Sequence, residues 1–157
     1  MSFEALPPLS ENEIQSFFSK AKNSERKRYP KILHSQGDYH NKVINFVLGD
    51  SYMQPHMHPS HEKIEKMFLM EGSFALIFFE ENGSVSEKII LQKGKRDIIE
   101  VPAYTWHTYV MLSEQTVIYE IMDGVYDPLT WKKMASWAPL ENSPDASNYL
   151  SFLKNHV

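Results

Sequence analysis

Residues 66–91 read KMFLMEGSFALIFFEENGSVSEKIIL and decide the fold of this chain. They contain three apolar stretches, and the turns between them carry Gly72 and Gly83. The second turn has Asn before Gly, which between two apolar stretches is a strong sign of a tight β-hairpin. We therefore predict three short strands joined by turns.

The same pattern of short apolar segments and turns continues on both sides of this stretch. Short apolar segments end at glycine, proline or a polar turn, at intervals of roughly 8–12 residues. The further strands expected on this basis are 43–48, 98–101, 106–111 and 116–122. Strands at this spacing, without helical patterns between them, predict a mainly β fold, an antiparallel barrel or sandwich rather than βαβ units.

Helical patterns occur only at the two ends of the chain. Ser10 and Glu13 form a capping-box pattern, which predicts a helix over about residues 11–22. Ser143 followed by Pro144 predicts the start of a second helix that ends near Asn155. We expect one structural domain with three segments. These are a helix and basic arm over 1–41, a barrel over 42–124 and a helical tail over 125–157.

Composition limits the classes of function. The chain of 157 residues is long enough for one buried core, and it has no cysteine, which excludes disulfides and thiolate chemistry. A net charge of −4 argues against nucleic-acid binding. The longest apolar run, residues 74–79, is too short to cross a bilayer, and the first residues do not resemble a secretory leader. We expect a cytoplasmic protein that binds neither nucleic acid nor membrane.

Histidines and a glutamate carry the strongest chemical signal. His56 and His58 are two residues apart, so on a strand both imidazoles point to the same face. Glu65 begins the next apolar stretch, and His107 begins a later one. Imidazole and carboxylate groups are preferred ligands of divalent transition metals, so these four residues predict a metal site. In the alternative interpretation, which we rank last, the histidines of a metal-free barrel are merely hydrogen-bonded.

The pattern resembles the two sequence motifs of the cupin superfamily. The matching positions are Gly49, His56, His58, Glu65 and Gly72 for the first motif, and Gly94 with Pro102 to His107 for the second. Tyr104 stands where the family has a turn glycine, and no Asn follows His107 at the expected place. The interval between His58 and Glu65 is longer than usual, so Glu62 competes as a ligand. The interval from Glu65 to Gly72 favours Glu65.

The similarity is closer to the WbuC-type cupin-fold metalloproteins, which are found among genes for surface-polysaccharide biosynthesis. The segments that carry it include 24–28, 55–59, 70–72, 106–107, 124–128 and 137–139. This resemblance implies a single cupin-type antiparallel β-barrel, a jelly roll, with an N-terminal and a C-terminal helix. It implies one divalent transition metal (Zn, Fe, Mn or Ni) bound by His56, His58, Glu65 and His107. It does not imply a particular reaction.

Other residues are candidates for contacts with a small-molecule ligand inside such a barrel. Tyr52 and Gln54 share strand parity with His56 and His58, and Trp106 adjoins His107, so all three are expected in the cavity wall. Aromatic side chains there suit sugar rings or small organic acids. Arg28 and His34 are candidates for binding a phosphate or carboxylate. For Arg28 the alternative, a solvated charge run, is equally favoured.

Glu120 and Tyr109 are the candidate catalytic groups, with core packing as the favoured alternative for Tyr109. The leading hypothesis is a metal-dependent enzyme acting on a small sugar-derived or carboxylate substrate, as an isomerase or epimerase, a hydrolase or a dioxygenase. The rival is a non-catalytic, metal-containing module that binds a sugar or metabolite. The resemblance also implies a homodimer, in which Phe3, Leu6 and Leu9 could belong to an exchanged segment.

Overall fold

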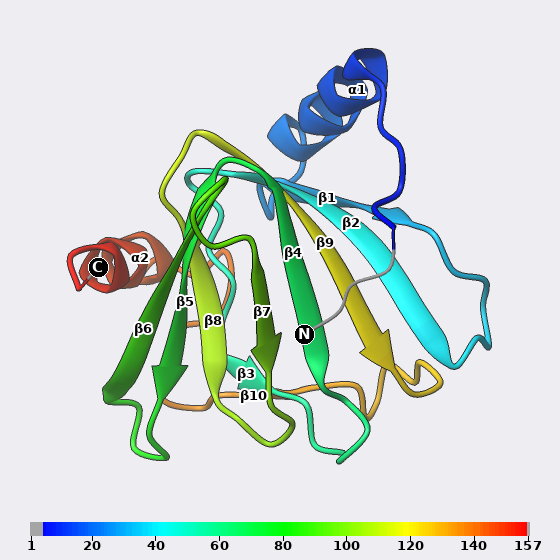
Figure 1. The fold of residues 1–157 in the computed structure, drawn as a ribbon. Helices are drawn as coiled ribbons and strands as arrows, with labels where there is room; N and C mark the ends of the chain where they lie inside the picture. The colour runs from blue at the N-terminus through cyan, green and yellow to red at the C-terminus, as the bar shows by residue number, and fades with distance from the viewer. Residues whose placement is uncertain (1–4, 157) are drawn as a thin grey trace.

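The computed structural model describes residues 5–156, and in them two five-stranded antiparallel sheets face each other as a mainly β jelly roll (Figure 1). The first sheet, in spatial order, contains β1 (Arg28–Ile32), β2 (His40–Leu48), β9 (Gln115–Asp123), β4 (Glu65–Glu71) and β7 (Ile98–Val101). The second contains β10 (Lys133–Met134), β3 (His56–Met57), β8 (His107–Met111), β5 (Ser73–Phe79) and β6 (Val85–Gln92). The predicted fold class is thus confirmed.

β5 shows why the apolar run of the sequence is continuous. Its side chains alternate between two hydrophobic clusters, and six of its seven residues are buried. Phe74 and Leu76 belong to the core between the sheets, whereas Ala75 and Ile77 belong to the cluster that includes α2 (Ala146–Lys154). A strand covered on both faces needs apolar residues at every position, not at alternate ones.

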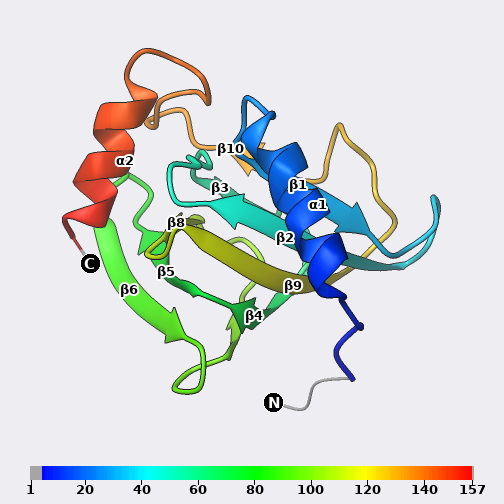
Figure 2. The same cartoon turned by 90° about the horizontal axis from the view of Figure 1, so that it is seen from above.

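The first helix, α1 (Glu11–Lys22), has the predicted bounds and the predicted cap. The Ser10 hydroxyl accepts a hydrogen bond from the Glu13 amide at 3.1 Å, and the Glu13 side chain returns to Ser10. Its buried residue Phe18 packs edge-on against Phe46 of β2, with ring centroids 5.5 Å apart. α1 therefore lies over β1 and β2, while α2 lies at the other side of the sandwich (Figure 2).

The second helix begins later than its sequence pattern predicts. Ser143 and Pro144 form a turn, and Asp145 is the N-cap residue, although its side chain makes no capping hydrogen bond. Within residues 5–156, no helix combines the length and the apolar character that a bilayer crossing needs.

Three strands were not predicted from the sequence, and two of them lie outside the expected barrel segment 42–124. β1 belongs to the expected basic arm and pairs with β2, and β10 belongs to the expected tail and pairs with β3. β1 is an edge strand with mostly exposed residues, so it lacks the apolar alternation that reveals a half-buried strand. β3 and β10 have two residues each, too few to show a period.

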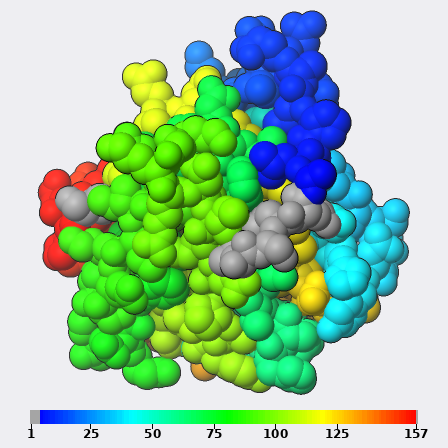
Figure 3. Space-filling model, in the orientation of Figure 1, coloured from blue at the N-terminus to red at the C-terminus, as the bar shows by residue number. Residues whose placement is uncertain are grey.

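The space between the sheets is closed on one broad side. In the space-filling view the chain from β4 to β7 (green) covers this face, and α1 (blue) projects beyond it (Figure 3). The apolar core of this region includes Leu69, Phe74, Leu91, Met111 and Ile118, all nearly or fully buried.

Candidate metal centre

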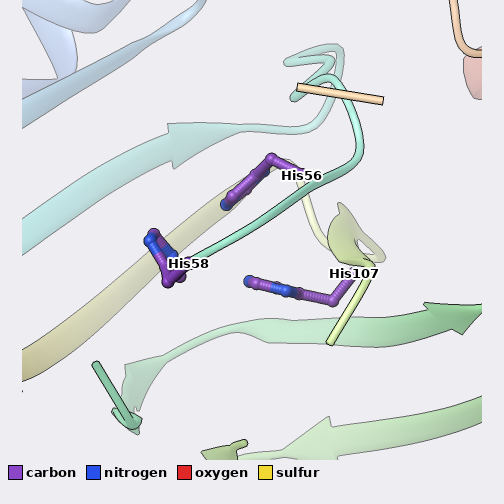
Figure 4. A group of neighbouring side chains, drawn as sticks. All are labelled: His56, His58 and His107. Atoms are coloured by element: carbon purple, nitrogen blue, oxygen red, sulfur yellow. The ribbon is translucent and has the colours of Figure 1, made fainter. Parts of the chain in front are cut away.

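Three histidine side chains point toward one another between the sheets (Figure 4). His56 lies on β3 and pairs in register with His107, the first residue of β8, while His58 follows one residue after β3. One ring nitrogen from each histidine lies within 4.8 Å of the other two, and all three residues are buried. Three buried histidines in this arrangement could bind a metal ion.

The hydrogen bonds of the rings determine which nitrogen faces the common point. In each ring Nδ1 lies next to a backbone carbonyl: His56 with Gln54 at 2.9 Å, His58 with Trp131 at 3.0 Å and His107 with Thr105 at 2.8 Å. A carbonyl accepts, so each Nδ1 carries the proton and each Nε2 keeps its lone pair. The buried Nε2 atoms of His58 and His107 have no hydrogen-bond partner within the described chain. Metal-binding histidines are oriented by carbonyls in this way, so the residues fit a divalent transition metal.

The two candidate carboxylate ligands, Glu65 and Glu62, lie in different surroundings. Glu65 is buried, and its Oε2 lies 3.2 Å from Nε2 of His58, in contact but without hydrogen-bond geometry. Glu62 lies in the surface loop, where its carboxylate accepts a hydrogen bond from Ser60. Of the two, only Glu65 borders the histidine cluster, although its carboxylate does not belong to the group of ligand atoms within 4.8 Å.

Burial favours the neutral, metal-binding form of the imidazoles. Desolvation lowers the pKa of His56 and of His107, and in each case a neighbouring histidine lowers it further. For Glu65 burial acts in the opposite direction, but the contact with His58 and the charges of the three imidazoles outweigh it and lower the pKa of the carboxyl. Burial thus favours the neutral imidazoles of His56 and His107, and the Glu65 carboxyl beside them favours its ionised form.

The turn that leads into His107 has a left-handed residue at the position where the resemblance led us to expect a glycine. Tyr104 has φ of +58°, a left-handed conformation that favours glycine. Its amide donates to the carbonyl of His58 at 3.0 Å, which ties this turn to the loop that carries two of the histidines.

The histidine cluster opens into a cavity of about 410 Å³. Both candidate catalytic groups, Glu120 and Tyr109, line it together with Met67. Burial and the adjacent Glu65 raise the pKa of the Glu120 carboxyl, which also contacts the amide of Asn45. Burial likewise raises the pKa of Tyr109, whose hydroxyl has no partner within residues 5–156. Burial thus favours the protonated form of both oxygen acids that line the cavity.

The expected anion-binding residues have different surroundings. Arg28 and His34 both line the cavity, but one terminal nitrogen of Arg28 donates to Glu141 at 2.9 and 3.0 Å. Its other terminal nitrogen donates to the Ser51 hydroxyl and to the Tyr52 carbonyl, each at 3.2 Å. The ring of His34 contacts the backbone of Lys42. Arg28 therefore connects chain segments to each other, rather than presenting a free guanidinium.

Three expected wall residues lie outside the cavity lining. Tyr52 donates to the carbonyl of Pro139 at 2.7 Å, and Gln54 donates to the carbonyl of Ala135 at 3.1 Å. Trp106 belongs to the outer cluster beneath α2. The parity argument placed Gln54 with the histidines, but β3 begins only at His56, so strand alternation does not extend back to it. Trp106 likewise precedes the first residue of β8, His107, and it packs in the cluster that includes Leu150 and Leu153 of α2.

The segment between β9 and β10 contributes cavity residues that the sequence reasoning missed. Tyr126, Trp131 and Lys132 line the cavity. Lys63, which is buried, donates to the carbonyl of Thr130 at 2.9 Å and lies over the Trp131 ring, so it holds this segment in place. The only available signal was three aromatic or cationic residues in a tail without periodicity.

Several solved structures share the fold of this chain. CapF from Staphylococcus aureus, a capsular polysaccharide assembling protein, superposes with a TM-score of 0.55 and 15% identity over 68% of this chain and 34% of CapF. Oxalate decarboxylase from Lactobacillus farciminis superposes with a TM-score of 0.52 and 16% identity, over 82% of this chain and 35% of the decarboxylase. Protein SO0799 from Shewanella oneidensis superposes with a TM-score of 0.51 and 10% identity, over 68% of this chain and 69% of SO0799. The chain thus spans about a third of CapF.

At these identities the structural likeness concerns the fold alone. No curated protein matches the sequence. The sequence model of the domain of unknown function DUF6016 matches residues 9–91, more than half of the chain. The chain therefore belongs to the DUF6016 family.

Proposed function

We propose that this protein is a metal-dependent enzyme of the cupin class that acts on a small sugar-derived or carboxylate substrate. The observation that carries the proposal is the set of three imidazoles whose Nδ1 atoms are held by carbonyls and whose Nε2 atoms converge at one end of a cavity. His56, His58 and His107 would hold the metal, with Glu65 as the fourth ligand. A divalent metal bound there supplies a Lewis acid that polarises a carbonyl or lowers the pKa of water.

Glu120 and Tyr109 would handle protons. The Glu120 carboxyl is kept protonated by burial and by Glu65, so it can give a proton to a substrate oxygen or carbon and take one back. The unpartnered Tyr109 hydroxyl can donate a hydrogen bond to the same substrate. A buried acid beside a metal suits reactions that move protons, so among the expected classes isomerisation or epimerisation is preferred to hydrolysis and dioxygenation.

The biological setting follows from two likenesses. The sequence resembles WbuC-type cupins, and the fold resembles that of CapF, a capsular polysaccharide assembling protein. We propose a cytoplasmic role in surface-polysaccharide biosynthesis, on a precursor sugar or sugar acid.

The metal is tested first. Elemental analysis of the purified protein should find about one divalent transition metal per chain, and His56→Ala or His107→Ala should lose it. His40→Ala is the matched control, because His40 is exposed on β2 and pairs with Asp123 at 2.6 Å. Substoichiometric metal in the wild type, unchanged by His56→Ala, would remove the proposal.

Catalysis is tested next, by proton exchange in deuterated water with a panel of sugar acids and nucleotide sugars, followed by NMR. Turnover that Glu120→Gln abolishes without loss of metal would support the enzyme. One observation favours the rival, a non-catalytic binding module: Glu120 is already engaged by Asn45 and Glu65, which is also what a structural carboxyl would show. Ligand binding without any exchange would decide for that rival.

We also propose that the protein is a homodimer. Of the residues expected in an exchanged segment, Phe3 lies outside the described residues, Leu6 is exposed and Leu9 packs against the cluster beneath α1. Light scattering that finds a monomer at micromolar concentration would exclude the dimer.

A further inference from the structure

Lys132 occupies a defined position in the cavity wall. It lies between Trp131, whose carbonyl is bound by Nδ1 of His58 at 3.0 Å, and Lys133, which pairs with Met57 of β3. The segment is therefore fixed directly to the histidine cluster. Lys132, the residue before β10, is half-buried and lines the cavity, whereas its neighbour Lys133 is exposed.

The other cations near the cavity already have partners within the protein. Arg28 is bound by Glu141, Ser51 and the Tyr52 carbonyl, and Arg26 contacts Glu141 at 3.3 Å. Lys63 donates to the carbonyl of Thr130. For Lys132, by contrast, the described part of the chain offers its ammonium no hydrogen bond or ion pair. A half-buried cation without a partner is costly, which favours a ligand that supplies one.

The electrostatic surroundings point the same way. Burial and the nearby charges of Arg26 and Arg28 lower the pKa of Lys132, and they outweigh the opposite effect of the carboxylates of Glu141 and Glu65. An anion bound beside it would counter both effects, because it replaces lost hydration and offsets the repulsion among three cations. A divalent metal bound at the histidine cluster, which lines the same cavity, would add positive charge.

We propose that Lys132 binds an acidic group of the ligand, a carboxylate or a phosphate, while another part of the ligand reaches the histidine cluster. The inference rests on the proposed function, since the metal would bind that other part. It narrows the substrate class to small acidic molecules such as sugar acids or sugar phosphates. An ammonium is a point charge that accepts either anion, so the residue alone does not choose between them.

The test is calorimetric titration of the metal-loaded protein with three probes of similar size: glucose, glucuronate and glucose 6-phosphate. In the wild type we expect at least one acid to bind more tightly than glucose. Lys132→Gln should weaken the binding of that acid by roughly 10- to 100-fold, the usual contribution of a hydrogen bond to a charged group. The affinity for glucose should not change. Lys133→Gln is the matched control and should retain the preference, and Lys132→Arg should keep most of it.

The titrations can contradict this inference without contradicting the proposed function. The inference is overturned if neither acid exceeds glucose in the wild type, or if Lys132→Gln keeps the preference while folded by circular dichroism. Preference for glucuronate alone or for glucose 6-phosphate alone identifies the acidic group. Metal content is measured on the same samples. Absence of metal from the wild type removes the proposed function, whereas full metal with binding independent of Lys132 removes only this inference.

Discussion

The two ends of the barrel interior are built from the same strands but have opposite character. Along β4 the inward side chains change from Glu65 through Met67 to Leu69, and along β8 they change from His107 through Tyr109 to Met111. In the ladder between β4 and β9, Leu69 pairs with Ile118 at the apolar end, and Met67 pairs with Glu120 nearer Glu65. One end is therefore apolar and the other polar.

The apolar end contributes mainly to stability, whereas the polar end carries the groups available for chemistry. At the apolar end the side chains are almost completely buried against each other, which is where close packing contributes most. At the polar end, buried atoms such as Nε2 of His107 and the hydroxyl of Tyr109 have no partner within residues 5–156, and a cavity remains. Unsatisfied polar groups are costly, so a protein that keeps them in one place has a use for them there.

The largest effect on stability is expected at the apolar end. Leu69 is fully buried, so Leu69→Ala should lower the free energy of unfolding by about 2–5 kcal/mol through lost burial and a new cavity. Urea unfolding measures this, with Leu112→Ala at an exposed position as the control. Metal bound per folded chain should not change, and a loss of metal would show that the two ends are not independent.

A smaller effect is expected from acid, and it should arise at the polar end. The folded-state pKa values of His56 and His107 lie below their ordinary value of 6.5, so the unfolded chain binds more protons and stability falls as pH drops below 6.5. Two such groups change the free energy of unfolding by at most about 2.7 kcal/mol per pH unit.

Thermal unfolding of chelated protein from pH 7.5 to 5 measures this dependence. His107→Gln should reduce the slope, because one of the two titrating groups is gone. A slope that His107→Gln leaves unchanged would assign the acid sensitivity to other residues.

The smallest effect is expected at Glu120. Its carboxyl is protonated in the folded state, so the neutral amide of Glu120→Gln should change the unfolding free energy by less than about 1 kcal/mol near pH 5. The raised pKa means that wild-type stability falls as pH rises above the ordinary value of 4.5, and the variant should lack this contribution. Glu100→Gln, at an exposed position of β7, serves as the control in parallel melts. A variant less stable than the wild type at pH 8 would contradict an uncharged Glu120.

Much of the fold could be predicted because its signals are local. Ser10 and Glu13 mark the start of α1 through contacts three residues apart, and Asn82-Gly83 marks the turn between β5 and β6. The spacing of His56 and His58 likewise predicts two imidazoles on one side of the chain. These signals needed no knowledge of distant residues.

The wall of the cavity could not be predicted in the same way. The parity that grouped Gln54 with the histidines applies only within a regular strand, and β3 is two residues long. Arg28 had the right chemistry for an anion, but Glu141, more than a hundred residues away, takes its donors. Lys132 had no periodic context at all.

Local sequence is enough to indicate the strands, the helices and the histidine pair, because hydrophobic period and capping act between near neighbours. The folded chain brought His107 to His56, set Glu120 beside Glu65 and left the Lys132 ammonium without a hydrogen bond or ion pair from residues 5–156. Those relations depend on which strands pair and on how a tail without periodicity packs against them. Both are decided by long-range packing and hydrogen bonding, not by local propensity.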